Sequence, residues 1–491
     1  MKEDQSSYRQ ITKATSLFGG VQVFNIIIAI IRSKFIAVLL GPIGMGIAGL
    51  LNSTTDLIGG LTELGLGKSA VRDVSSANGT GDKIRIATVV TVLRRWVWVT
   101  GTLGVLIMLV LSPWLSQLTF GNRDYTLAFI WISITLLFTQ LTSGQLAILQ
   151  GMRKLQYLAK ASLSGSALGL IITIPLYYRF GIKGIVPAII FTSVISLLLS
   201  YYFAKKVKIE SVKVSLVSTL AEGKNMLILG FMISLSGLTA LGASYIVRIF
   251  ISKTGSVEQV GLYTAGFAII NTYVGLVFTA MGTDYYPRLS AVAHSNELCK
   301  QAINQQAEIA LLILAPILMV FLVFIKWVTI ILYSNKFIAI DEMIHWAALG
   351  MFFKAATWSI GYILLAKGAS KIFFWNELFG NIYLLGLNIL GYHFLGLTGL
   401  GISFMVGFLL YFIQVFVLSK IKYQFSFDSA FIRIFAFQFL LAISCFIIVK
   451  IAGKPYSYIS GMGLIMISVW YSYKELDKRL GIKSIITGFR N

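Results

Sequence analysis

Apolar runs of roughly 20 residues, the length that crosses the hydrocarbon core of a bilayer as a helix, recur about fourteen times in this 491-residue chain. This constrains the fold strongly, because a lipid-exposed backbone must satisfy its hydrogen bonds within a helix or a closed barrel. The residues are 57% hydrophobic and 12% charged, which is typical of a membrane protein. We therefore predict an all-α polytopic membrane protein with about 14 transmembrane helices. The predicted spans lie near 16–40, 44–67, 97–118, 126–150, 161–180, 184–204, 226–251, 261–285, 308–333, 343–366, 373–394, 398–419, 431–452 and 457–473.

The net charge of +22 follows the predicted topology, so it does not indicate nucleic-acid binding. Alternate loops hold most of the 41 lysines and arginines, whereas the opposite loops hold only Arg123, Arg179, Lys183, Lys253, Lys336 and Lys454. The polar first 15 residues lack the apolar region of a signal peptide. We expect both termini on the cytoplasmic side of the membrane. Residues 82–96 are basic and amphipathic, which predicts a segment lying on the inner leaflet among anionic lipids.

A direct repeat with an offset near 215 divides the chain. Gly46-Ile-Ala corresponds to Gly261-Leu-Tyr, and Tyr178-Arg-Phe with Gly181 and Gly184 corresponds to Tyr392-His-Phe with Gly396 and Gly399. The pattern predicts two six-helix lobes related by a parallel repeat, with the substrate site between them. The predicted parts are an N-terminal lobe at 1–204, a cytoplasmic linker at 205–225, a C-terminal lobe at 226–420, and two extra spans with a cytoplasmic tail at 421–491.

Two arginines inside predicted spans are the main candidates for function. Arg32 and Arg248 are 216 positions apart and so hold similar places in the two lobes. A guanidinium at bilayer depth costs at least roughly 2.5 kcal/mol and usually faces a polar cavity on a substrate path. The alternative is an ion pair between helices, for instance between Arg32 and Asp56.

Other polar residues share faces of the predicted spans. Asn25 precedes Arg32 by seven positions on one helical face, and Asn271 and Lys354 lie within later spans. We expect a water-filled cavity lined by Arg32, Asp56, Arg248 and Lys354 that binds an anionic substrate. Asp56 and Glu63 are candidate carriers for H⁺ or Na⁺, and the alternative is a salt bridge that packs helices together or a residue at the cytoplasmic edge.

Sites for other chemistry are not indicated. The two cysteines, Cys299 and Cys445, give no disulfide framework, and the three histidines have no metal-ligand spacing. We identify no catalytic residues, no metal site and no cofactor, so we expect that the protein is not an enzyme.

Several segments resemble the Wzx-type O-antigen and enterobacterial common antigen flippases, in the polysaccharide transporter branch of the MOP superfamily. They are Lys34–Gly46, with Gly41-Pro42 near its end, Phe120–Tyr125, Gly261–Tyr263 leading to Tyr286–Ser290, and the stretch from Leu332 through Lys354 and Gly361-Tyr362 to Glu377. The superfamily also contains lipid II flippases and MATE drug antiporters. In this resemblance Arg32 matches a cavity arginine of the lipid II branch, whereas Lys34 and Lys354 match lysines of the O-antigen branch.

The resemblance implies a flippase of O-antigen-type lipopolysaccharide biosynthesis. Its substrate would be an undecaprenyl-diphosphate-linked oligosaccharide, carried from the inner to the outer leaflet by alternating access. Partners would include the polymerase and chain-length proteins of the same pathway. Two alternatives are a MATE-like cation-coupled antiporter, whose cavity should be acidic, and a membrane glycosyltransferase or polymerase, which should have a sizeable outer loop.

Overall fold

The computed structural model describes residues 2–210, 212–453 and 455–480, with side chains from residue 20 onward except at 233, 283 and 480. These residues form helices joined by short connections, and no strand occurs among them. Ten of the helical stretches are long and apolar enough to cross a membrane. The prediction of an all-α polytopic membrane protein is therefore confirmed, whereas the number of fourteen spans stays a prediction.

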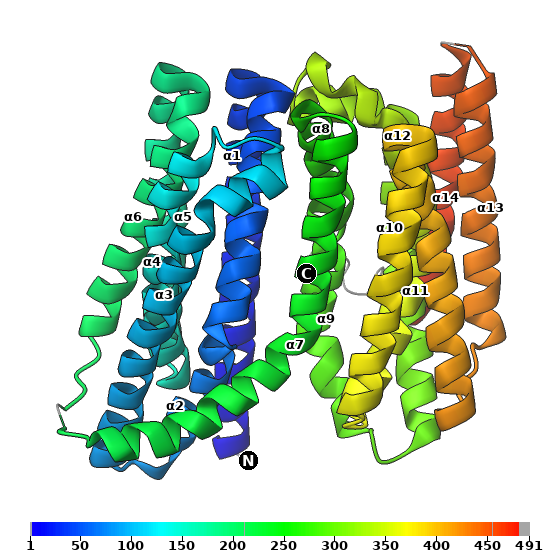
Figure 1. Cartoon of the computed structure of the whole chain (residues 1–491). Helices are drawn as coiled ribbons and strands as arrows, with labels where there is room; N and C mark the ends of the chain where they lie inside the picture. The colour runs from blue at the N-terminus through cyan, green and yellow to red at the C-terminus, as the bar shows by residue number, and fades with distance from the viewer. Residues whose placement is uncertain (1, 211, 454, 481–491) are drawn as a thin grey trace, which may run out of the picture. The chain divides into compact units, whose positions relative to one another are not determined.

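Contacts between the helices group them into two compact units, the first ending at Gly261 and the second beginning at Leu262. The predicted division into lobes, linker and extra spans stays a prediction, and its last residues, 481–491, lie outside the described part of the chain. The first unit contains α1 (Lys2–Glu63), α2 (Leu66–Thr80), α3 (Lys83–Phe120), α4 (Thr126–Gly151), α5 (Leu155–Phe180), η1 (Gly181–Gly184), α6 (Ile185–Lys205), α7 (Leu216–Thr254) and the start of α8 (Val257–Phe267) (Figure 1). The second contains the end of α8, η2 (Ala268–Val274), α9 (Leu276–Ala291), α10 (Asn296–Leu332), η3 (Asn335–Ile340), α11 (Asp341–Ala366), α12 (Ser370–Tyr423), α13 (Ser429–Ile451) and α14 (Tyr456–Leu480).

Three of the helical stretches are too long to cross a bilayer once. Gly20–Glu63, Leu155–Lys205 and Ser370–Tyr423 contain 44, 51 and 54 residues. At a rise of about 1.5 Å per residue each would be roughly 65–80 Å long, about twice the hydrocarbon thickness. Each is interrupted by one glycine with positive φ, namely Gly41, Gly181 and Gly396. Each stretch therefore supplies two segments of spanning length.

Backbone geometry repeats at the predicted offset of 215. Gly181 has φ 56° and ψ −135°, and Gly396 has φ 57° and ψ −138°. Three residues after each break, Gly184 and Gly399 approach the backbone carbonyls of Leu176 and Gly391, which are again 215 positions apart. The same turn therefore joins two spans in each half of the sequence.

The amphipathic stretch 82–96 forms the first turns of α3 and not a helix of its own, and its predicted place on the inner leaflet stays a prediction. Asp82 caps α3 by accepting hydrogen bonds from the backbone N–H groups of Ile84 (2.8 Å) and Arg85 (3.2 Å), and the helix continues unbroken to Phe120. The first part of α7 crosses the lower ends of α2 and α3 before the helix turns upward (Figure 1).

Glycines let the first part of α7 lie against the neighbouring backbone. A Cβ atom at Gly230 would lie 2.4 Å from the carbonyl oxygen of Leu64, and one at Gly223 would lie 1.6 Å from Trp96 Nε1. Trp96 Nε1 donates a hydrogen bond to the carbonyl of Thr219 at 3.2 Å. This packing holds α7 to the ends of α1 and α3.

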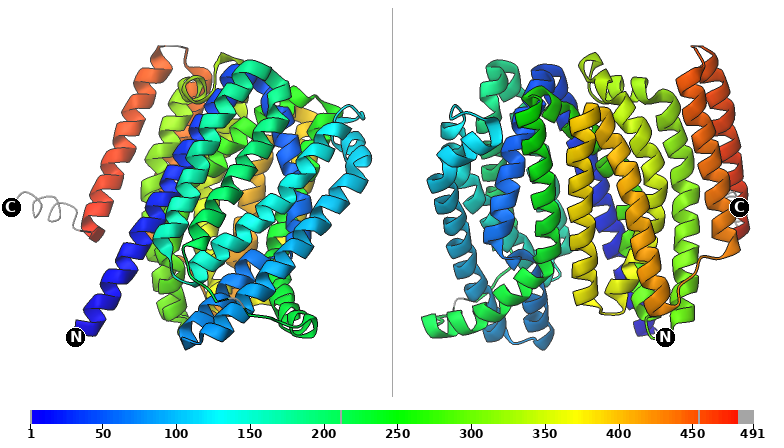
Figure 2. Two further views of the ribbon diagram at one scale, coloured as in Figure 1. Left: turned by 90° about the vertical axis from the view of Figure 1, so that its left-hand side faces the viewer. Right: turned by 45° about the vertical axis from the view of Figure 1, so that its right-hand side comes forward.

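The α13–α14 hairpin packs on α10 in the second unit, and Figure 2 shows its two helices side by side. Arg479 bridges Glu308 of α10 and Glu475 of α14, both at 2.6 Å.

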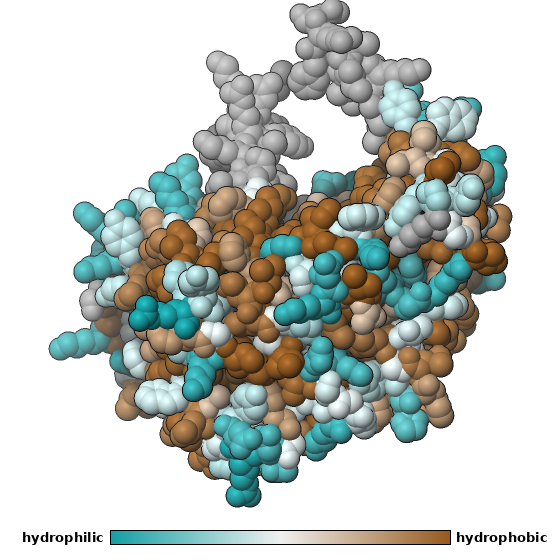
Figure 3. Space-filling model, turned by 90° about the horizontal axis from the view of Figure 1, so that it is seen from above, coloured by the Kyte–Doolittle hydropathy of each residue, from teal (hydrophilic) through white to brown (hydrophobic). Residues whose placement is uncertain are grey.

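Helix ends expose hydrophilic side chains among hydrophobic ones when viewed along the helices (Figure 3). Apolar side chains such as Val110 and Ile171 are exposed along the spans, as expected for a lipid-facing surface.

At the break in α12, a side chain in place of Gly396 should strain the backbone without disturbing the packing. Gly396→Ala should lower the free energy of unfolding by about 1–3 kcal/mol, because an L-residue at this φ and ψ is strained. An added Cβ has open space there, so packing would not contribute. Gly386→Ala is the matched control, since that glycine has open space without a positive φ. Thermal unfolding of the purified protein should show a lower Tm only for Gly396→Ala, and equal Tm values would contradict the strain argument.

Candidate functional site

A polar cavity of about 360 Å³ lies within the first unit, among α1, α4, α5 and α6. The first half of α1 contributes Arg32, and the second half contributes Asn52 and Asp56 after the chain reverses at Gly41. The lining residues are Arg32, Ile36, Ala48, Asn52, Thr55, Asp56, Thr135, Thr139, Thr142, Thr173, Tyr177, Ala188, Ile189, Thr192, Ser193 and Ser196. We call this the Arg32 cavity.

Hydroxyl groups dominate the wall of the Arg32 cavity, on nine of its sixteen residues. Several of them donate their one hydrogen to a carbonyl of their own helix, including Thr55 to Leu51 (2.8 Å) and Ser193 to Ile190 (2.7 Å). A hydroxyl has one donor and two acceptor lone pairs. Hydroxyls bonded in this way therefore face the cavity as acceptors, which suits a ligand that carries many O–H groups.

Arg32 supplies the positive charge of this cavity. Its side chain is half-buried, and its Nε–H has no hydrogen-bond partner among the described residues. A Cβ atom at Gly169 of α5 would lie 3.4 Å from one terminal nitrogen, so α5 packs close to the guanidinium. Because an unpaired buried donor costs about 1–3 kcal/mol, the guanidinium is well placed to receive an acceptor from a ligand.

Asp56 is exposed despite its place in the middle of a membrane-spanning sequence, so it faces an accessible space. No ion pair joins Arg32 to Asp56 within the described part of the chain, which leaves the alternative of a locked Arg32–Asp56 bridge without support. The positive charge that acts on Asp56 comes instead from Arg248. Arg248 in turn donates hydrogen bonds to the hydroxyl of Ser244 and, at 3.2 Å, to its carbonyl.

The second unit brings together Lys354 and Asn271, which the sequence also placed in a substrate site. Lys354 Nζ donates a hydrogen bond to Asn271 Oδ1 at 2.5 Å. The ammonium lies 5.6 and 5.1 Å from the ring centres of Phe404 and Phe408. Asn271 Nδ2 is buried without a partner among the described side chains. Asn271 belongs to η2, a π-helical stretch, and such stretches are frequent at functional sites.

The other predicted site residues lie outside the Arg32 cavity. Asn25 donates through Nδ2 to the Ser162 hydroxyl at 3.1 Å, two turns of α1 before Arg32. Glu63 accepts a hydrogen bond from the Ser143 hydroxyl at 3.2 Å at the end of α1, and its predicted role in ion coupling stays a prediction. Lys34 is half-buried and lies on a different face of α1 from Arg32. No group of three residues among His, Cys, Asp and Glu has metal-binding spacing within the ranges that the structure describes.

We call the nine hydroxyl-bearing residues of the Arg32 cavity the hydroxyl wall. The sequence patterns did not predict it. Thr135, Thr139 and Thr142 follow each other at i, i+4 and i+7 on one face of α4. This spacing, together with Thr192, Ser193 and Ser196 on α6, could have indicated the hydroxyl wall from the sequence. Single threonines are frequent in membrane spans, so only their convergence in space distinguishes these from others.

Comparison with known proteins gives a family match over most of the chain. A family described as "Polysaccharide biosynthesis protein" matches residues 35–342. The Lipid III flippase of Escherichia coli (strain K12) is 21% identical over 371 residues, which are 74% of this chain and 87% of that protein. A putative O-antigen transporter of Shigella flexneri is 25% identical over 355 residues, covering 70% of this chain and 82% of that protein.

Solved structures share the fold at low sequence identity. The lipid II flippase MurJ in an inward closed conformation has a TM-score of 0.72 and 12% identity, covering 94% of this chain and 99% of MurJ. A multidrug resistance MATE family transporter of the MOP superfamily, in an inward-facing conformation, has a TM-score of 0.70 and 16% identity, covering 82% and 94%. The flippase and the drug transporter are thus both similar in fold, and the fold does not choose between them.

Cysteine substitutions can test whether the Arg32 cavity is open to water. Both native cysteines are buried, so their background reaction should be low. Asp56→Cys should react with a charged, membrane-impermeant thiol reagent in purified protein, because Asp56 is exposed. Thr54→Cys, two residues away and fully buried, should not react under the same conditions. Equal protection of both positions would show that this part of α1 is dry.

Proposed function

The chain belongs to the polysaccharide biosynthesis protein family, and from this premise we propose that it is a flippase for a lipid-linked oligosaccharide. The proposed substrate is an O-antigen-type repeat unit joined through a diphosphate to undecaprenol. The protein would carry it from the inner to the outer leaflet of a bacterial inner membrane by alternating access. The observation that carries the proposal is the Arg32 cavity, in which one guanidinium stands among nine hydroxyl groups.

Each part of the proposed substrate has a chemical counterpart in the first unit. A diphosphate requires positive charge and N–H donors, and the planar guanidinium of Arg32 offers both. Sugar hydroxyls are donors, and the threonine and serine oxygens whose hydrogens are used within their own helices are acceptors. The undecaprenyl tail is apolar and remains in the bilayer. The positive-inside bias supports cytoplasmic termini, so that the inner leaflet is the starting side.

Lys354 and Asn271 are proposed as contacts of the second unit with an anionic group. The Lys354 ammonium is held by Asn271 and by two phenylalanine rings. A phosphate oxygen could replace the Asn271 carbonyl as the acceptor, and the unpartnered Asn271 Nδ2 could donate to a second oxygen.

The exposed carboxylate of Asp56 is the observation that favours a second candidate, a cation antiporter. Asp56 is an exposed carboxylate in the same cavity, and a MATE family transporter shares the fold. The two candidates differ in the role of Arg32, since a guanidinium repels a cationic substrate. In the flippase proposal Asp56 is instead a binding site for a coupling proton or sodium ion. Transport that keeps its ion dependence after Asp56→Asn would remove this role.

Arg32 variants test the flippase proposal. Arg32→Ala should reduce the amount of surface polysaccharide roughly tenfold or more, since hydrogen bonds between charged groups contribute about 1.5–3 kcal/mol each. Arg32→Lys should retain part of the activity, because it keeps the charge but loses the planar pair of donors. Polysaccharide is measured in cells that lack the native gene, at equal protein level. Normal polymer from Arg32→Ala would contradict the proposal, and increased efflux of cationic drugs would favour the antiporter.

The hydroxyl wall has its own test. Thr139→Val preserves shape but removes an exposed hydroxyl from the cavity, so the rate of flipping of a lipid-linked oligosaccharide should fall roughly two- to tenfold. Thr102→Val is the matched control, because Thr102 is exposed on α3 outside the cavity. The rates are measured in proteoliposomes with a fluorescent substrate. Equal rates for the two variants would argue against sugar contacts at this wall.

A further inference from the structure

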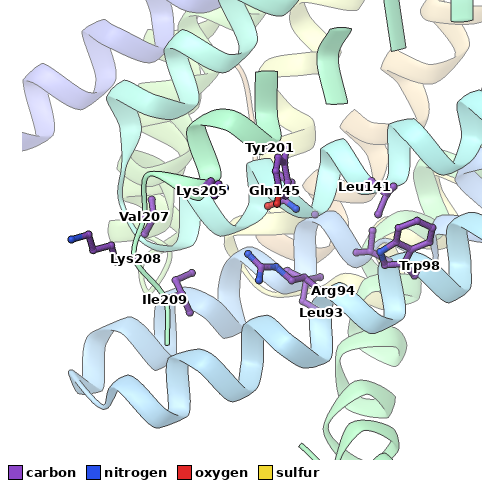
Figure 4. Close-up of a pocket in the computed structure, with 12 residues that line it drawn as sticks. Leu93, Arg94, Trp98, Leu141, Gln145, Tyr201, Lys205, Val207, Lys208 and Ile209 are labelled. Atoms are coloured by element: carbon purple, nitrogen blue, oxygen red, sulfur yellow. The ribbon is translucent and has the colours of Figure 1, made fainter. Parts of the chain in front are cut away.

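A second cavity lies elsewhere in the first unit, with no lining residue in common with the Arg32 cavity. It has a volume of about 390 Å³, within the range of small-ligand pockets, roughly 300–1,000 Å³. It is formed by α3, α4, the last turns of α6 and the segment that follows α6 (Figure 4). The lining residues are Leu93, Arg94, Val97, Trp98, Leu141, Gly144, Gln145, Tyr201, Lys205, Val207, Lys208 and Ile209. We call it the Arg94 pocket.

Its lining carries positive charge without a matching negative charge. Arg94, Lys205 and Lys208 line the pocket, and no acidic residue does. Nearby cations on α3 do have acidic partners, since Lys83 pairs with Glu210 (3.7 Å) and Arg85 with Glu222 (2.5 Å). In the described part of the chain, neither Arg94 nor Lys205 takes part in an ion pair. The pocket therefore has an excess of cations that an anion can satisfy.

A buried acceptor lies beside these cations. Gln145 Oε1 is buried and has no hydrogen-bond partner among the described atoms. Figure 4 shows the Gln145 amide and the Arg94 guanidinium reaching toward the same space beneath Tyr201, whereas the Lys208 ammonium points away from it. An unpaired buried acceptor destabilises the fold, because it has lost its hydrogen bonds to water. A ligand that carries a hydroxyl donor as well as a negative charge would satisfy both groups.

The aromatic residues place the pocket at the boundary between lipid and water. Trp98 and Tyr201 are each 53% exposed, and both belong to spans near the point where basic residues begin. Tryptophan and tyrosine are enriched at the headgroup level of membranes. Leu93, Val97 and Leu141 give the pocket an apolar part next to its cations. The combination matches a molecule with an anionic polar head and an apolar body.

We propose that the Arg94 pocket binds the headgroup of an anionic glycerophospholipid with free hydroxyl groups, of the phosphatidylglycerol class. The phosphate lies between Arg94 and Lys205, and a headgroup hydroxyl donates to Gln145 Oε1. The acyl chains follow Trp98 into the bilayer. A zwitterionic phosphatidylethanolamine binds more weakly, because its ammonium group is repelled by the two cations. The site does not depend on the flippase proposal, since it shares no residue with the transport cavity.

Lipid binding to the purified full-length protein tests this proposal, measured by native mass spectrometry after delipidation. The probes are phosphatidylglycerol and phosphatidylethanolamine with the same acyl chains. The variant Arg94→Gln/Lys205→Gln should weaken phosphatidylglycerol binding roughly tenfold or more, since a basic residue near an anionic lipid contributes about 1 kcal/mol. Gln145→Leu, which keeps both charges, should weaken it roughly two- to tenfold. A thermal unfolding curve shows that each variant is folded.

Lys206→Gln is the control variant for charge. Lys206 neighbours Lys205 but does not line the pocket, and its ammonium lies 4.4 Å from the ring centre of Tyr202. This variant should bind phosphatidylglycerol within about twofold of the unmodified protein, because exposed charges contribute little. Equal losses for Lys206→Gln and the double variant, or equal binding of the two lipids, would overturn the proposal.

Competition separates the possible sources of the phosphate. Millimolar inorganic phosphate should not displace phosphatidylglycerol, since it lacks an apolar body, and displacement would indicate a free-anion site instead. Undecaprenyl diphosphate should not displace it either, and displacement would make the pocket an access site for the transport substrate. Both of those outcomes overturn the phospholipid assignment. Since the readout is lipid binding, failure of Arg32 variants in transport would leave this result unaffected.

Discussion

The cost of holding a guanidinium at bilayer depth constrains the whole first unit. Arg32 can remain there only if its surroundings replace the water that it would otherwise bind. The structure meets this requirement by lining the same cavity with hydroxyls from α4, α5 and α6, and by reversing α1 at Gly41 so that Asn52 and Asp56 return to it. The break at Gly41 and the polar wall thus both contribute to the polar surroundings of one charged side chain.

The two units hold their cations in different surroundings. Arg32 lies among hydroxyl acceptors with one N–H unpaired, whereas Lys354 is fixed by the Asn271 amide and by the faces of Phe404 and Phe408. An ammonium on aromatic rings is stabilised without an anion, by about 0.5–2 kcal/mol for each ring. The second cation is therefore pre-positioned by neutral groups, and the first is left open to a ligand.

Much of this organisation follows from sequence patterns, and the remainder follows from contacts that patterns do not encode. The repeat offset predicted equivalent turns, and Gly181 and Gly396 have nearly the same backbone angles. Lys354 and Asn271 were predicted as site residues because polar groups are rare in membrane spans, and they share a hydrogen bond. The hydroxyl wall was missed because a threonine that bonds its own helix is common in any span. The path of α7 was missed because it depends on close contacts such as that of Gly230 with Leu64.

The central claim is that the Arg32 cavity receives the diphosphate and the first sugars of a lipid-linked oligosaccharide. The most direct test is a cryo-EM structure of the protein with such a substrate bound in a lipid nanodisc. We expect density for the diphosphate within hydrogen-bond distance of the Arg32 guanidinium, and density for the sugars along Thr139 and Ser193. A substrate bound away from Arg32, with that cavity filled by side chains, would contradict the account.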